Sequence, residues 1–190
     1  YAADGTVNPI QGSNLAITTL GVFILWLGWF GFNGGSQLAM GSIGDIADVS
    51  RIFVNTNMAA AAGAIVAMIL TQITYGKVDL TMVLNGALAG LVSITAEPLT
   101  PTLGWSLIIG GIGGAIVVYG VPLLDKFKID DVVGAIPVHL FAGIWGTLAV
   151  VITNSDASFV TQIYSIVVVG LFVVITSGII SLRLGILLKH

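Results

Sequence analysis

The hydrophobic pattern of this chain consists of long apolar stretches, separated by short segments that hold the charged residues. Each stretch is close to the ~20 residues that an α-helix needs to cross the hydrocarbon core of a bilayer. The pattern therefore predicts an all-α fold, a multi-spanning membrane helix bundle in a single domain over 1–190. The six predicted spans cover about 15–32, 52–76, 80–96, 105–124, 132–153 and 159–182.

The distribution of lysine and arginine predicts how these spans are oriented. An even number of spans places both ends of the chain on one side of the membrane. The end segments and alternate turns on that side hold five basic residues, Lys77, Lys126, Lys128, Arg183 and Lys189, whereas the opposite segments hold only Arg51. Because basic residues concentrate in cytoplasmic loops, Tyr1 and His190 are both expected to be cytoplasmic. Segments 33–51, 97–104 and 154–158 are then expected to face outward.

Composition and charge exclude several classes of protein. Six basic and nine acidic residues in 190, with 56% hydrophobic residues, are incompatible with a soluble or a disordered chain. A net charge of −3 with scattered basic residues offers no surface for nucleic acid. The absence of cysteine removes disulfides and thiolate chemistry. The first residue is Tyr1 rather than methionine, so we expect a processed chain or a piece of a longer protein.

Glycines recur inside the predicted spans at positions where two helices would approach closely. Gly86 and Gly90 are four residues apart in the third span, and Gly110 and Gly114 are four apart in the fourth. Each pair lies on one face of its helix, and small residues at this spacing allow the backbones of neighbouring membrane helices to meet. We interpret both pairs as structural.

His139 is an ionisable residue inside the fifth span, roughly 11 Å along the helix from its start. One interpretation is an imidazole that hydrogen-bonds to a neighbouring helix. The other is a residue on a substrate pathway, the usual role of ionisable groups at membrane depth. Gly143 and Gly146 at helical spacing, and Pro137 nearby, would leave space beside the ring, which favours a pathway.

A second candidate cluster occupies Gly28 to Ser36, GWFGFNGGS, at the outer end of the first span. Trp29, Phe30 and Phe32 suit an aromatic belt at the membrane surface. With the Ser36 hydroxyl, the same rings also suit a cation site, because a cation over an aromatic face gains ~0.5–2 kcal/mol. The sequence leaves both interpretations open.

The remaining polar residues have simpler interpretations. Asp130 and Asp131 directly precede the fifth span and are expected to cap it by accepting hydrogen bonds from its free amides. The amides inside the spans are expected to form interhelical hydrogen bonds, and the outer carboxylates to be solvated loop charges. The amides are those of Asn55, Asn57 and Asn85, and the carboxylates are those of Asp45, Asp48 and Glu97.

The set of polar and ionisable residues in this chain also makes an enzymatic function unfavourable. Ser36 and His139 lie at different depths, too far apart for a nucleophile and its base. No second histidine or carboxylate lies inside a span to complete a metal site, and no phosphate-binding glycine loop is present. We therefore expect no enzyme, no metal and no cofactor. The functions that remain are passive or ion-coupled permeation across the membrane, a sensor, or a scaffold built on the same helices.

Four segments together resemble the ammonium transporter family, the Amt/Mep/Rh proteins, and its Amt branch in particular. They are GWFGFNGGS (28–36), VNTNMAAAAGAI (54–65), NGALAGLVSITA (85–96) and DDVVGAIPVHLFAGIWGT (130–147). The resemblance implies an eleven-span fold, made of two five-helix halves of inverted topology and a final helix, assembled as a homotrimer. This chain resembles spans six to eleven, and thus a partial domain that lacks the first half.

The resemblance also implies roles for individual residues. Phe32 matches a pore-blocking phenylalanine, Ser36 the serine of an outer ammonium site, and His139 the second of two pore histidines. Trp29 matches a family tryptophan to which we give a structural role, and Asp131 matches a carboxylate at the cytoplasmic end. The first pore histidine and the partner gate residues of the family belong to the first half.

The implied function is uptake of ammonium across the plasma (inner) membrane, through an apolar pore lined by histidine. An apolar constriction penalises hydrated K⁺ or Na⁺, whereas ammonium can hydrogen-bond in sequence along imidazole nitrogens. Implied partners are membrane lipid, the first half of the transporter, two further copies in a homotrimer and a PII-type regulator on the cytoplasmic face. An ammonium sensor of the same fold is the alternative, and a structural membrane subunit without substrate is a third possibility.

Overall fold

The computed structural model describes residues 12–187, with side chains described for residues 12–183. Every regular element in this part of the chain is helical, which confirms the predicted all-α class. The elements are α1 (Leu15–Gly35), α2 (Ile43–Tyr75), α3 (Leu80–Thr95), α4 (Leu103–Lys126), the π-helical η1 (Ile136–Phe141), α5 (Ala142–Thr153) and α6 (Phe159–Leu187).

The helices follow the predicted apolar ranges, with differences at their ends. Within the described residues, α1, α2, α4, the continuous segment formed by η1 and α5, and α6 are long and apolar enough to cross a membrane. α3 is shorter, at 16 residues. α2 begins at Ile43 rather than near residue 52, because Ser42 and Asp45 form a capping box that starts the helix ahead of the apolar stretch.

The fifth helical segment begins at Ile136 rather than at residue 132. Gly134 has a φ of +75°, a left-handed conformation that a helix cannot continue through. Pro137 follows and has no N–H to donate, so the first turn is built differently from an α-helix. The result is the six-residue π-helix η1, which leads directly into α5.

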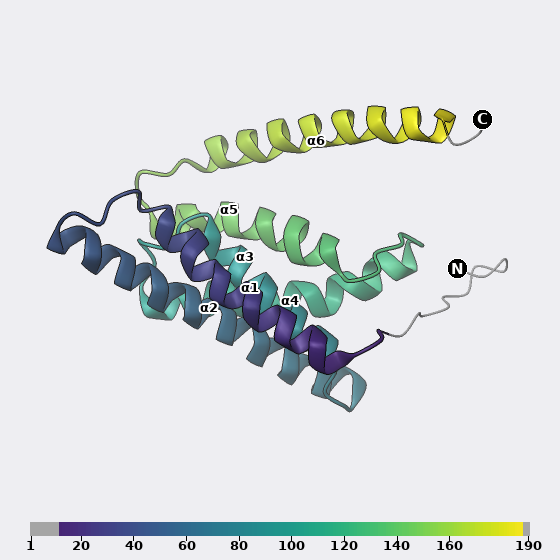
Figure 1. The fold of residues 1–190 in the computed structure, drawn as a ribbon, viewed down its shortest axis with the longest axis horizontal. Coiled ribbons are helices and arrows are strands. Elements are labelled where there is room, and N and C mark those ends of the chain that lie inside the picture. The colour runs from purple at the N-terminus through teal and green to yellow at the C-terminus, as the bar shows by residue number, and fades with distance from the viewer. Residues whose placement is uncertain (1–11, 188–190) are drawn as a thin grey trace.

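Consecutive helices run in opposite directions, so the connections gather at two ends of the bundle (Figure 1). The links 36–42, 96–102 and 154–158 lie at one end. The links 76–79 and 127–135 lie at the other end, where α1 begins and α6 ends. The predicted orientation requires the links to be grouped in this way. Tyr1 and His190 themselves lie outside the described residues.

Three helices, α2, α3 and α4, form the centre of the bundle, and their backbones meet at glycines. A Cβ atom on Gly86 or Gly114 would meet backbone atoms of Gly63 in α2, and one on Gly90 or Gly110 would meet the backbone of Ala59. The two glycine pairs therefore allow close helix contacts, as their spacing predicted, and the structure shows that the partner is α2. Close backbone approach of this kind is how membrane helices gain packing energy without a hydrophobic driving force between them.

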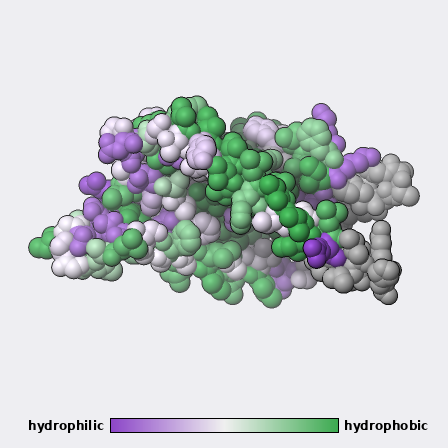
Figure 2. Space-filling view, turned by 90° about the horizontal axis from the view of Figure 1, so that it is seen from above, coloured by the Kyte–Doolittle hydropathy of each residue, from purple (hydrophilic) through white to green (hydrophobic). Residues whose placement is uncertain are grey.

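The outer helices α1 and α6 bury little of their surface against the rest of the chain. None of the most apolar window of α6 is buried, and this helix packs only against α5 among the described elements. In the space-filling view, hydrophobic side chains cover much of the middle of the visible face, and hydrophilic ones gather toward its two ends (Figure 2). Such a distribution suits contact with lipid or with further apolar helices.

Candidate functional site

The C-terminal end of α1 presents three of the predicted site residues on one helix face. Trp29, Phe32 and Ser36 are spaced three and four residues apart, which places them in a row along the helix. The rings of Trp29 and Phe32 are 5.9 Å apart between centroids and tilted by 52°. The hydroxyl of Ser36, the C-cap residue, donates to the carbonyl oxygen of Phe32 at 2.9 Å. Phe32 is 63% exposed.

The opposite face of the same turn anchors α1 to α2. Asn33 is 1% exposed, and its Nδ2 donates to Oγ1 of the fully buried Thr56 at 3.0 Å. Gly34 lies directly against the ring of Phe53, so a larger residue at this position would have to displace that ring. Because this face is fixed on α2, Phe32 and Ser36 are left facing away from the bundle. The anchoring role of Asn33 was missed from the sequence, where the usable signal was a polar side chain near the end of an apolar helix.

His139 lies in η1, and its side chain is exposed. Its neighbours Pro137 and Val138 are buried: Pro137 lies close to Gly120 of α4, and Val138 packs in a cluster that includes Val117. These contacts turn His139 out of the bundle. The imidazole lines a cavity of about 390 Å³ between α5 and α6.

The lining of this cavity is mostly aliphatic, with a few polar groups. The hydroxyls of Thr147 and Ser165 both line it, and each donates to a carbonyl of its own helix, Gly143 and Thr161 respectively. Gly143 lies beside His139 as predicted, but Gly146 does not. It is buried against the backbone of Ser93 in α3, because the wider π-helical turn shifts the side-chain register along this segment.

Asp131 caps the start of this segment, as its position in the sequence predicted. One carboxylate oxygen accepts from the backbone N–H of Ala135 and the other from that of Ile136, both at 2.8 Å. These amides would otherwise lack a partner at the start of the helix. The carboxylate thus holds the first turn of the segment that carries His139.

The structure brings some of the candidates together and leaves others apart. Trp29, Phe32 and Ser36 form one group on α1. Among the described elements, α1 packs against α2 and α3 and makes no contact with η1 or α5. His139 therefore belongs to a different surface of this chain from the aromatic group.

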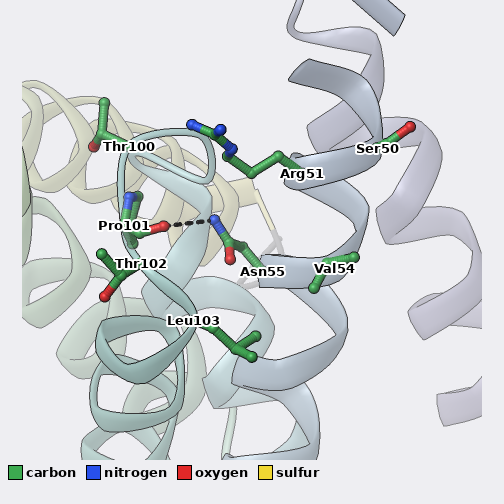
Figure 3. Close-up of a pocket in the computed structure, with 8 residues that line it drawn as sticks. All are labelled: Ser50, Arg51, Val54, Asn55, Thr100, Pro101, Thr102 and Leu103. Carbon is green, nitrogen blue, oxygen red and sulfur yellow. Dashed lines mark hydrogen bonds between the residues drawn. The ribbon is translucent and has the colours of Figure 1, made fainter. Parts of the chain in front are cut away.

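A second cavity, of about 520 Å³, lies between the first half of α2 and the link before α4, and none of these site residues lines it (Figure 3). Arg51 and Asn55 line it from α2, facing Thr100 and Pro101 of the link before α4. Nδ2 of Asn55 donates to the carbonyl oxygens of Pro98 and Pro101, both at 2.9 Å. The predicted interhelical role of Asn55 was thus wrong, because the amide ties a helix to a loop.

Asn85 makes a similar bond, from its Nδ2 to the carbonyl oxygen of Val133 at 2.9 Å. This bond joins α3 to the link before η1, so the interhelical interpretation was wrong here too. Proline-rich and glycine-containing links leave carbonyl groups without helical partners, and a nearby amide satisfies them.

A sequence profile described as Ammonium Transporter Family matches residues 2–189. The chain belongs to the ammonium transporter family. As in other members, its apolar helices make it an integral, multi-pass membrane protein. The multi-spanning helical fold expected from the sequence is confirmed.

Individual relatives support the same assignment. The chain is 52% identical to the ammonium transporter Amt2 of Archaeoglobus fulgidus over 150 residues, which cover 78% of this chain and 31% of Amt2. It is 41% identical to the ammonium transporter of Bacillus subtilis over 147 residues, which cover 77% of this chain and 35% of that protein. The chain thus spans about a third of the length of these relatives.

Solved structures show the same partial match. A protein described as a sensor Amt protein aligns with a TM-score of 0.80 and 35% identity, over 88% of this chain and 43% of that one. Mep2 of Candida albicans aligns with a TM-score of 0.82 and 25% identity, over 94% of this chain and 42% of Mep2.

Proposed function

We propose that this chain forms the second part of an ammonium pore, with His139 on its wall. The observation that carries the proposal is an exposed imidazole on an otherwise apolar membrane helix, beside an aliphatic cavity. A polar group exposed at membrane depth needs water, a substrate or another helix beside it. Since the chain covers about a third of its relatives, we propose that helices of a first half complete the pore.

At the outer end of α1, the geometry suits recognition of a small cation. The proton of the Ser36 hydroxyl is used in the bond to the Phe32 carbonyl, so the lone pairs of Oγ remain to accept an N–H of ammonium. The faces of Trp29 and Phe32 add an attraction for positive charge. We propose that Phe32 blocks the pore to hydrated ions and that ammonium passes it toward His139.

At His139, a neutral imidazole offers one N–H donor and one acceptor nitrogen. Ammonium or ammonia can exchange hydrogen bonds with such a group inside an apolar passage, whereas K⁺ and Na⁺ would lose their hydration without replacement. We therefore assign to this chain a transport role rather than a catalytic one.

The assembly and membrane placement follow as further proposals. We propose a homotrimer in the plasma (inner) membrane, with the 76–79 and 127–135 links facing the cytoplasm and able to meet a PII-type regulator. The basic residues Lys77 and Lys128 on these links, and Lys126 at the end of α4, support this orientation. Single cysteines at Lys128 and Asp156 test it: an impermeant thiol reagent added outside should label the second and not the first.

The experiment that tests transport uses the complete protein, meaning this chain with any residues that its gene encodes before Tyr1 and after His190. In liposomes it should take up labelled methylammonium, and ammonium should compete. Residues 1–190 alone should not conduct, because half of the pore wall is missing. Uptake by this shorter chain equal to that of the complete protein would contradict the two-part pore.

A sensor of the same fold is the second candidate, favoured by the alignment with the sensor Amt protein. Saturable ammonium binding by the complete protein without measurable uptake would select the sensor over the transporter.

A further inference from the structure

Trp29 in α1 is held by a residue 66 positions away in α3. The indole Nε1–H of Trp29 donates to Oγ1 of Thr95 at 2.7 Å, and both side chains are partly buried. The Thr95 hydroxyl in turn donates its own proton to the carbonyl oxygen of Leu91 at 2.6 Å. Since a hydroxyl has one proton, this second bond fixes its orientation and leaves a lone pair for the indole.

The indole so held is the ring that contacts Phe32. Their centroid separation of 5.9 Å and tilt of 52° lie within the range of favourable aromatic pairs. The other nearby phenylalanine, Phe30, pairs instead with Phe53 of α2 at 5.3 Å. Of the ring contacts in the described part of the chain, Trp29 therefore provides the one that restrains Phe32, which is otherwise largely exposed.

We propose that Thr95 is a positioning residue for the outer end of the pore: through the Trp29 indole it fixes the orientation of the Phe32 ring, and thereby the discrimination between ammonium and K⁺. The consequence for ions rests on the proposed transport function, whereas the link from Thr95 to Phe32 does not. A phenylalanine on an exposed helix face has several accessible rotamers. Removing the hydrogen bond between Thr95 and the Trp29 indole should change the populations of the Phe32 rotamers about two- to tenfold.

The test compares two substitutions of Thr95 in the complete protein. Thr95→Val keeps the shape of the side chain and removes the hydroxyl, whereas Thr95→Ser keeps the hydroxyl. Thr71→Val is the control, because Thr71 is a buried threonine of the same bundle whose hydroxyl bonds only to carbonyls of its own helix, those of Ala67 and Met68. Trp29→Phe removes the indole donor from the other side and replaces Thr95→Val if that variant fails to fold.

The first measurement follows Phe32 itself, with 4-fluorophenylalanine incorporated at position 32 and observed by ¹⁹F NMR. We expect the resonance to move in Thr95→Val and in Trp29→Phe, and to stay in place in Thr95→Ser and Thr71→Val. An unchanged resonance in Thr95→Val would overturn the proposal.

The second measurement is the ratio of K⁺ flux to ammonium flux in liposomes. We expect Thr95→Val to raise this ratio about two- to tenfold, with Thr95→Ser and Thr71→Val unchanged. A fall in total flux with an unchanged ratio would mean a purely structural role and would also overturn it. A moved resonance with no ammonium flux in any variant, the unsubstituted protein included, would support the link from Thr95 to Phe32 and reject the transport function.

Discussion

The carboxylate of Glu97 accepts a hydrogen bond from Nδ2 of Asn154 at 3.1 Å, which joins the end of α3 to the end of α5. The other carboxylate oxygen faces the backbone N–H groups of Leu99 and Thr100, at 3.3 and 3.4 Å. The expectation that Glu97 is a solvated loop charge was therefore wrong. Glu97 organises the link between α3 and α4.

Replacing Glu97 by alanine should destabilise the protein, because three donors lose their acceptor at once. Hydrogen bonds to a charged group contribute about 1.5–3 kcal/mol, so we expect a loss in that range for Glu97→Ala. Glu97→Gln, which keeps one carbonyl acceptor, should lose less. Thermal unfolding in detergent measures the effect, with the exposed Ser155→Ala as a control. Equal stability of Glu97→Ala and the unsubstituted protein would show that these bonds contribute nothing.

Gly114 should not tolerate even one additional carbon. A Cβ at this position meets the backbone of Gly63, which cannot move aside as a side chain would. We expect Gly114→Ala to cost about 1–3 kcal/mol through overpacking and to reduce the yield of folded protein. Gly178 in α6 has open space around it, so Gly178→Ala should be neutral or stabilising by up to about 1 kcal/mol. Similar unfolding temperatures for the two variants would contradict the close contact.

Asp79 should make stability depend on pH in the acidic range. Partial burial alone would raise the pKa of this carboxyl. Hydrogen bonds from the Thr81 hydroxyl and from the N–H groups of Met82 and Thr81, together with the Lys77 charge, outweigh burial and lower the pKa. Because the folded pKa is lower than the unfolded one, the stabilisation is fully present above about pH 4 and disappears as the pH falls through the folded value.

The check is the unfolding temperature between pH 3 and 6 for the unsubstituted protein and for Asp79→Asn, which keeps a capping oxygen but does not titrate. The difference between the two should shrink as the pH falls. If the difference between the two unfolding temperatures stays constant from pH 3 to 6, Asp79 is not the group whose titration changes the stability.

His139→Leu should abolish methylammonium uptake by the complete protein while leaving its oligomer intact on a native gel. Leucine has a similar volume, and the imidazole is exposed, so the packing of this half does not depend on it. Thr147→Val is the control in the same cavity, because the Thr147 hydroxyl already bonds to the Gly143 carbonyl. Retained uptake with a weakened oligomer would instead assign His139 to helix packing, and a gain of K⁺ leakage would assign it to selectivity.

The sequence could predict the features that depend on residues close together in the chain. The apolar stretches between charges located the helices, and the spacing of Gly110 and Gly114 identified a contact face. Asp131 was recognised as a cap because the amides that donate hydrogen bonds to it are at most five residues away. In each case, helical geometry alone relates the residue to its surroundings.

Features that depend on distant residues were missed. Nothing local relates Trp29 to Thr95, although Thr95 carries a hydroxyl at the last position of an apolar helix, where a hydrogen-bond partner could be expected. Asn55 was expected to bond to another helix, but the free carbonyls of Pro98 and Pro101 reach it only once α2 and α4 have packed. The π-helical turn at His139 likewise depends on how Gly134, Pro137 and α4 fit together.

The backbone contacts at Gly63 and Ala59 constrain how this protein can move. Helices whose main chains touch cannot slide past one another without opening a gap or creating an overlap, and packed interiors resist both. We therefore expect α2, α3 and α4 to behave as one rigid body during any transport cycle. Displacements would then fall mainly on α6, which carries little buried surface, whereas Asn33 and Trp29 hold the end of α1 that carries Phe32 on α2 and α3.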